Sequence, residues 1–214
     1  MARDLNNLAY LLSATDRPAE AEPLYRRAVT ILETGLGPNH PNVADTIGNL
    51  AILLQRANRC AEAEPLFRRA LAIDEASFGP DHPRAAIRLN NLAELLREAN
   101  RYAEAEPLYR RALSINEASY GPSHPNVAAC LNNLALLLKA TNRGREVEPL
   151  SRRGLEILLT FTANTGHPHP HLHAALDNYF GILLDIGRSA EAAQAEIAAL
   201  AEKHGLALNR ANPA

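Results

Sequence analysis

The sequence contains a unit that repeats at a constant interval of 42 residues. A short segment of the form GPxHP lies at residues 37–41, 79–83 and 121–125. A longer segment follows the same interval, as LNNLAYLL at 5–12, IGNLAILL at 47–54, LNNLAELL at 89–96 and LNNLALLL at 131–138. A divergent copy, LDNYFGILL, lies at 176–184 after three additional residues. Self-similarity at this period predicts a stack of similar units rather than one compact core.

Each unit is predicted to form two helices. In the third unit, four apolar residues follow the i, i+3, i+4, i+7 spacing of one helix face: Leu89, Leu92, Ala93 and Leu96. The segment RYAEAEPLYRRAL at 101–113 has a counterpart in every unit and shows the same spacing. Asn100 precedes this second helix and is a candidate N-cap. Pro107 lies inside the helix, where we expect a slight kink or a ragged first turn rather than a break. Each unit is therefore predicted to be a helical hairpin.

The GPxHP segment reads as the connection between hairpins. Gly79 follows the second helix, where a left-handed residue is expected, and Pro80 prevents the helix from continuing. Asp81 is expected to cap the next helix, with Pro83 in its first turn. Asn39 and Ser123, which are also good caps, replace Asp81 in the other copies. For the three histidines, His40, His82 and His124, we expect a structural role. Successive hairpins lie ~10 Å apart, whereas zinc needs nitrogen at ~2 Å, so the three cannot share one ion.

The composition excludes several classes of function. The formal net charge of −2 gives no basis for binding nucleic acid or an anionic membrane. No apolar run approaches the ~20 residues of a membrane span. Two cysteines, Cys60 and Cys130, are too few for a disulfide framework and favour the cytoplasm. Because no nucleophile–base motif, phosphate loop or cofactor fingerprint occurs, we expect neither an enzyme nor a cofactor.

The unit resembles the tetratricopeptide repeat. Six residues match its L-G-x-x-Y…A-x-x-x-F…A pattern, with Ala in place of Gly: Leu92, Ala93, Leu96, Ala105, Tyr109 and Ala112. The longer unit, with its EAEPLYRRAL segment and its histidine linker, is similar to the repeats of kinesin light chain and related bacterial proteins. This resemblance implies an all-α solenoid of about five antiparallel helix-turn-helix hairpins. It also implies a protein-interaction module, as part of a larger bacterial-type protein.

The predicted array is a single domain over residues 1–207, followed by a flexible tail at 208–214. The repeats are expected at approximately 2–43, 44–85, 86–127, 128–172 and 173–207.

One asparagine per unit is the main candidate for ligand binding. At ~100° per residue, the face of the first helix that carries Ile87, Asn91 and Glu94 lies opposite its core face. An asparagine occupies this place in all five units: Asn7, Asn49, Asn91, Asn133 and Asn178. An amide can donate to one backbone group and accept from another, so this row predicts binding of an extended peptide. The resemblance points the same way, because kinesin light chain and O-linked N-acetylglucosamine transferase carry groove asparagines that contact peptide. In the alternative interpretation, each asparagine bonds a neighbouring helix and fixes the repeat spacing.

Residues beside the asparagines are expected to set specificity. The neighbouring positions on the same face are Tyr10, Ile52, Glu94, Leu136 and Gly181. Local charge would come from Arg3, Arg56, Glu98 and Asp185. The mixture of signs and apolar residues is not typical of a clamp for a terminal carboxylate.

The second helices carry paired arginines that invite a phosphate-binding interpretation. A glutamate stands four residues before the first arginine of each pair, in Glu22–Arg26, Glu64–Arg68, Glu106–Arg110 and Glu148–Arg152. This spacing instead predicts a solvated face of ion pairs.

Two further features suggest other functions. The segment HPHPHLH at 167–173 could gather imidazoles around a metal ion, although no acid or thiol lies nearby in sequence, and we expect no functional metal there. The last helix is expected to present small apolar residues to solvent: Ala192, Ala195, Ile197, Ala198, Ala199 and Ala201. No capping repeat precedes Leu5, so both ends of the array are expected to associate with other protein surfaces. The alternative to peptide binding is therefore a self-assembly element, or a fragment, that associates through its terminal hairpins as a homo-oligomer.

Overall fold

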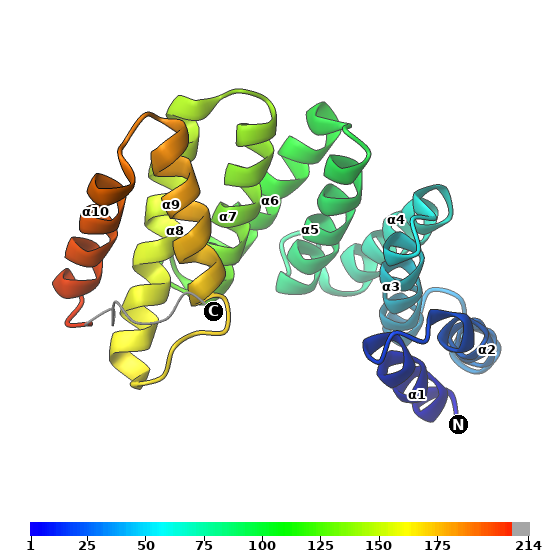
Figure 1. Ribbon diagram of the computed structural model, residues 1–214. Coiled ribbons are helices and arrows are strands. Elements are labelled where there is room, and N and C mark those ends of the chain that lie inside the picture. The colour runs from blue at the N-terminus through cyan, green and yellow to red at the C-terminus, as the bar shows by residue number, and fades with distance from the viewer. Residues whose placement is uncertain (207–214) are drawn as a thin grey trace. The chain divides into compact units, whose positions relative to one another are not determined.

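The computed structural model describes residues 1–206, and within them the regular structure consists of ten α-helices (Figure 1). The helices are α1 (Ala2–Ala14), α2 (Pro18–Leu36), α3 (Pro41–Arg56), α4 (Cys60–Phe78), α5 (Pro83–Glu98), α6 (Tyr102–Tyr120), α7 (Pro125–Ala140), α8 (Gly144–Thr165), α9 (Leu172–Asp185) and α10 (Ala190–Lys203). The predicted first helix of each hairpin is odd-numbered and the second is even-numbered. The all-α hairpin fold of the solenoid class is confirmed. The predicted tail at 208–214 lies outside the described residues.

The chain divides into two compact parts, residues 1–115 and 116–214, and the boundary falls within α6. In the N-terminal part, α1 packs on α2, α2 on α3, α3 on α4 and α4 on α5. In the C-terminal part, α7 packs on α8, α8 on α9 and α9 on α10. Of the helices in the described part of the chain, none combines the length and apolar character that crossing a bilayer requires.

The core between the hairpins follows the repeated apolar pattern. The second helices of the first three hairpins, α2, α4 and α6, each contain one buried aromatic ring and fully buried alanines. The rings belong to Tyr25, Phe67 and Tyr109, all at most 1% exposed. Alanine at neighbouring positions, such as Ala63 and Ala70, lets the adjacent helix approach closely. The spacing that predicted the hairpins is therefore also the spacing that packs them.

The histidine of the GPxHP linker caps the following helix. The Nδ1 atom of His82 accepts a hydrogen bond from the backbone N–H of Arg84 at 3.2 Å. His40 and His124 make the same bond to Asn42 and Asn126, each at 3.1 Å. The prediction that Asp81 is the cap was wrong, because the residue directly before the first-turn proline is the histidine. The histidine rings also stack on the preceding helix end, His82 on Phe78 and His124 on Tyr120.

The glycine of the linker has a positive φ, as expected, but not the left-handed helical conformation. Gly79 has φ 96° and ψ 156°, a conformation that is almost restricted to glycine. This extended geometry ends α4 and directs the chain toward the histidine cap of α5.

The turn inside each of the first four hairpins is made by a left-handed residue. Asp16, Asn58, Asn100 and Asn142 have φ between 57° and 59°. The next backbone N–H, that of Arg101, donates to the carbonyl of Leu96 at 2.8 Å and closes the end of α5. Asn100 is therefore the C-terminal turn residue of α5, and the prediction that it caps α6 was wrong. Asparagine fits because it tolerates positive φ better than most side chains.

The prolines inside the second helices do not break them. Pro23, Pro65, Pro107 and Pro149 are each the sixth residue of a continuous helix. All four are exposed, so the carbonyl that loses its helical partner lies near solvent.

Candidate interaction surface

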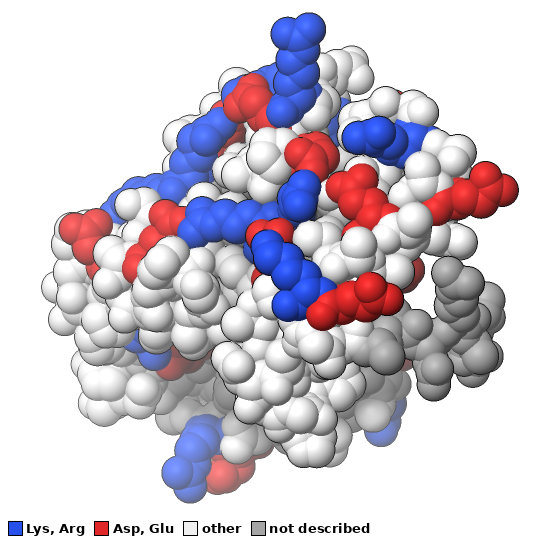
Figure 2. Space-filling model, turned by 90° about the vertical axis from the view of Figure 1, so that its left-hand side faces the viewer, with Lys and Arg blue, Asp and Glu red and all other residues white. Residues whose placement is uncertain are grey.

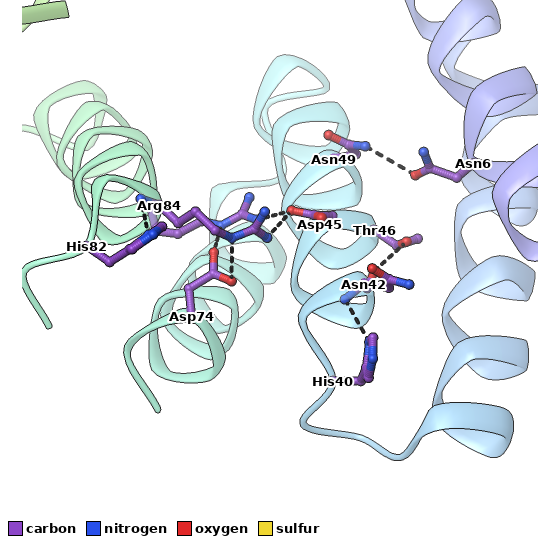
Figure 3. A network of polar contacts seen from close by, with 10 residues as sticks. Asn6, His40, Asn42, Asp45, Thr46, Asn49, Asp74, His82 and Arg84 are labelled. Atoms are coloured by element: carbon purple, nitrogen blue, oxygen red, sulfur yellow. Dashed lines mark hydrogen bonds and ion pairs between the residues drawn. The ribbon is translucent and has the colours of Figure 1, made fainter. Parts of the chain in front are cut away.

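The repeated asparagines of the first helices bond to asparagines of the preceding hairpin. In the N-terminal part, Nδ2 of Asn49 donates to Oδ1 of Asn6 at 3.1 Å (Figure 3). In the C-terminal part, Nδ2 of Asn178 donates to Oδ1 of Asn132 at 2.8 Å. Both bonds join successive first helices and support the alternative interpretation, in which the amide fixes the repeat spacing. Each bond uses one of the two N–H donors of the amide, so binding capacity is left over for a ligand.

The other predicted site residues lie on the first helices with graded exposure. The half-buried ones are Ile52, Asn91, Glu94, Asn133, Leu136 and Gly181. The exposed ones are Arg3, Asn7, Tyr10, Arg56, Glu98 and Asp185. The carboxylate of Glu98 accepts a hydrogen bond from Gln55 at 2.7 Å, which links α5 to α3. Lys139 pairs with Asp185 at 2.6 Å and links α7 to α9.

Glu94 is the most strongly held charge on this face. Its carboxylate accepts hydrogen bonds from Tyr109 at 2.6 Å and from Arg97 at 2.5 Å. Burial acts to raise the pKa of Glu94, but the bonds from Arg97 and Tyr109 outweigh it and hold the pKa below its usual value. Burial and the same carboxylate raise the pKa of Tyr109. Glu94 is therefore a fixed negative charge at neutral pH.

A network of four charges joins the second hairpin to the third (Figure 3). Arg88 donates to Asp74 at 2.7 Å and to Asp45 at 2.5 Å. Arg84 donates to Asp45 at 2.6 Å and to Asp74 at 3.2 Å. Asp74 is fully buried, and Arg88 nearly so. Because each aspartate is shared by two guanidinium groups, the buried charges compensate one another.

Sequence reasoning missed this network, although the repeat contained a signal. Gly48 replaces the asparagine found at the same place in other units, and Arg88 stands where other units have Thr46 or Cys130. These departures from the repeat occur at facing positions in adjacent hairpins.

The arginine pairs of the second helices form the predicted ion pairs in the first three hairpins. Arg26 contacts Glu22 at 2.7 Å, Arg68 contacts Glu64 at 2.7 Å, and Arg110 contacts Glu106 at 2.8 Å. The fourth hairpin differs. Arg152 contacts Glu156 at 3.5 Å and Glu196 at 4.0 Å, while Glu148 accepts a hydrogen bond from Tyr179. The expected Glu148–Arg152 pair was therefore wrong, because the glutamate is engaged by α9.

The family model for the tetratricopeptide repeat matches residues 1–76, 49–118 and 89–160. The chain belongs to the tetratricopeptide repeat family. Repeats of this family typically mediate protein–protein interaction, and proteins built from them are in general scaffolds rather than enzymes.

Several solved structures of other proteins share the fold. A putative kinesin light chain from Podosopora anserina with nearly identical TPR-like repeats is 22% identical, with a TM-score of 0.74 and coverage of 95% of this chain and 94% of that chain. BtubC (BKLC) from P. vanneervenii is 24% identical, with a TM-score of 0.78 and coverage of 99% and 82%. Pseudomonas aeruginosa pilF is 20% identical, with a TM-score of 0.65 and coverage of 95% and 77%. No curated protein matches the sequence. At these identities the likeness shows the fold alone.

The histidine segment at 167–173 of this tetratricopeptide repeat protein is held by local bonds. Nδ1 of His169 accepts from the backbone N–H of His171 at 3.2 Å, and its ring meets the edge of Phe161. Within residues 1–206, no three His, Cys, Asp or Glu side chains gather in a way that would hold a metal ion.

The last helix, α10, is less apolar at its surface than the sequence predicted. In α10, Ile197 and Ala201 are buried, so the prediction that they face solvent was wrong. The exposed members of that predicted set are Ala192, Ala195 and Ala199. The reason is that α10 folds back on α9 and buries its larger side chains there.

Proposed function

We propose that this protein binds an extended peptide or protein segment along the face formed by its first helices. The observation that carries the proposal is the recurrence of asparagine at the same place on all five first helices, opposite their core positions. Asn49 and Asn178 keep one N–H donor and accepting capacity beyond their inter-helix bonds. An extended backbone presents alternating N–H and C=O groups, which match a row of amides.

The residues around the asparagines would give the face its selectivity. Within residues 1–115, Ile87 is 58% exposed, and Ile52 is half-buried. Glu94 and Glu98 supply negative charge, and Arg56 supplies positive charge. We infer that the ligand combines apolar side chains with charges of both signs.

The test uses Asn6 and Asn49 as a matched pair. Peptides would be selected from a random library on the wild-type protein, and their Kd measured by fluorescence anisotropy. Asn6→Ala removes the inter-helix hydrogen bond but leaves the Asn49 amide free to bind a peptide. Asn49→Ala removes the inter-helix bond and the peptide-binding amide together. We expect similar losses of stability but a five- to tenfold weaker Kd only for Asn49→Ala, from one lost hydrogen bond of about 1 kcal/mol. Equal Kd values for all three proteins would show that the asparagine is purely structural.

A second candidate function, self-association through α1, is favoured by two leucines. Leu8 and Leu11 are 47% and 59% exposed, whereas their counterparts Leu50 and Leu53 are each 3% exposed because the preceding hairpin covers them. Sedimentation across a concentration series tests this proposal. Association that Leu8→Glu and Leu11→Glu abolish would support it, and a monomer at all concentrations would contradict it.

A further inference from the structure

The packing of α8, α9 and α10 departs from that of the other hairpins. In α8, Ser151 stands at the position of the buried rings Tyr25, Phe67 and Tyr109. A ring instead comes from α9, where Tyr179 replaces the leucine found at the same place in the preceding first helices. Tyr179 is fully buried, and its hydroxyl contacts Glu148 at 3.1 Å and Glu196 at 2.8 Å. The buried aromatic residue of this region therefore lies on α9 instead of α8, and its hydroxyl is within hydrogen-bonding distance of two carboxylates.

Within residues 1–115, an arginine just before one second helix forms an ion pair with a glutamate of the preceding second helix. Glu22 bonds Arg59 at 2.6 Å, and Glu64 bonds Arg101 at the same distance. We call this ion pair the arginine latch; among the described residues it does not form between α8 and α10. Arg59 is the N-cap residue of α4, but the N-cap of α10 is Ser189, one residue after Arg188. Because α10 starts one residue later relative to its arginine, Arg188 is displaced from the latch position. Within residues 1–206 its guanidinium makes no ion pair.

A second arginine of this region also has no counterpart in the repeat. Arg145 stands where the other units have Ala19, Ala61 and Ala103. It is exposed, and among the described residues it makes no ion pair. A guanidinium remains charged at any physiological pH, so Arg145 and Arg188 are two cations that make no ion pair with any described residue.

The side chains of Arg145 and Arg188 line a cleft formed by α8, α9, α10 and the turn between α9 and α10. Its volume is about 360 Å³, and its lining includes Arg145, Arg152, Leu183, Ile186, Arg188 and Glu196. The two glutamates of the cleft, Glu148 and Glu196, are bound to the hydroxyl of Tyr179, and three arginines leave a net charge of +1. Ile186 is 46% exposed and adds an apolar wall. In Figure 2, which faces the α10 end of the chain, basic side chains form a broken band with acidic ones beside it.

We propose that this cleft binds an acidic peptide segment, with an Asp or Glu carboxylate on Arg145 and Arg188 and an apolar side chain against Ile186. Planar guanidinium groups bind carboxylates through paired, charge-assisted hydrogen bonds. The exposed apolar side chain of Ile186 favours a polypeptide over a free anion, which would leave Ile186 uncovered. The cleft is formed largely by second helices, so this site is separate from the face of the first helices and does not rest on the function proposed for it.

The test uses a short, fluorescently labelled, acetylated peptide of alternating Glu and Leu, with its Lys–Leu analogue as the control for charge. Anisotropy titrations would compare the wild type with the double variant Arg145→Ala, Arg188→Ala. We expect the double variant to bind the acidic peptide at least tenfold more weakly, because two charge-assisted contacts are lost. The Lys–Leu analogue is expected not to bind. Since both arginines are exposed, circular dichroism and melting should be unchanged.

Two controls make the result specific. The variant Arg26→Ala, Arg68→Ala removes the same charge from arginines that are already ion-paired, and Asn49→Ala alters the first-helix face. Both are expected to bind like the wild type. Wild-type affinity in the Arg145, Arg188 variant, or equal weakening in the Arg26, Arg68 variant, would overturn the proposal. Inorganic phosphate that binds more tightly than the acidic peptide would overturn the assignment to a polypeptide.

Discussion

The guanidinium of Arg88 occupies the space that a side chain at residue 48 would fill. A Cβ placed on Gly48 would lie 2.5 Å from Nη1 of Arg88. Alanine in a helix is normally better than glycine by about 1 kcal/mol. Arg88 is held by two aspartates and has little freedom to move away, so the ordinary preference is reversed here.

We predict that Gly48→Ala destabilises the protein by about 1–3 kcal/mol, the usual cost of overpacking a buried site. The matched control is Gly35→Ala in α2, where a new Cβ meets no atom within 4 Å. That substitution is expected to be neutral or stabilising. Urea unfolding of both variants, followed by circular dichroism, provides the comparison. A more stable Gly48→Ala protein would contradict the assigned role of Arg88.

The buried charges of the same network predict strong coupling between Asp74 and Arg88. Asp74→Asn leaves the Arg88 guanidinium without its buried anion and should cost about 3–5 kcal/mol. The corresponding positions in the next unit are Asn116 and Cys130, whose side chains are 3.2 Å apart. The double variant Asp74→Asn, Arg88→Cys copies that pair and is expected to recover most of the loss. Additive costs in a double-mutant cycle would show that the two residues act independently.

The caps of the first helices provide a prediction about the linker. His82→Ala removes the acceptor for the N–H of Arg84 and should destabilise the protein by about 1 kcal/mol. His82→Asn restores an acceptor and is expected to be milder. Asp81→Ala should change the unfolding free energy by less than about 0.5 kcal/mol, since Asp81 makes no cap bond. A larger effect at Asp81 than at His82 would reverse our assignment of the cap.

Glu94 predicts a pH dependence of stability. Its folded-state pKa lies below the ordinary value of 4.5, so its contribution is complete above about pH 4.5 and is lost as the pH falls through the folded-state pKa. Glu94→Gln should therefore lower the unfolding free energy by about 1 kcal/mol at pH 7, a modest figure because the carboxylate is partly screened. The difference from wild type should shrink in acid. An identical difference at pH 7 and pH 3 would exclude the charge as its cause.

How far the sequence predicts the structure depends on whether a feature repeats. The leucine and alanine spacing recurs in every unit, and the prediction of hairpins from it was correct. The cap was misassigned because Asp81 ranks above histidine as a general cap, although His82 occupies the decisive position before the proline. The Asp74–Arg88 pair was missed because it occurs at one interface and joins residues of different hairpins. In the fifth unit, the one-residue shift of α10 relative to Arg188 is a feature of packing that sequence alignment does not reveal.

The central claim is that ligands bind to the face of the first helices. The most direct test is methyl NMR of the protein titrated with a peptide selected from a random library. We predict shifts of the Ile52 and Ile87 methyl groups on α3 and α5, with Ile31 on α2 unchanged. Shifts confined to methyl groups of the second helices, with Ile52 and Ile87 unmoved, would contradict the account.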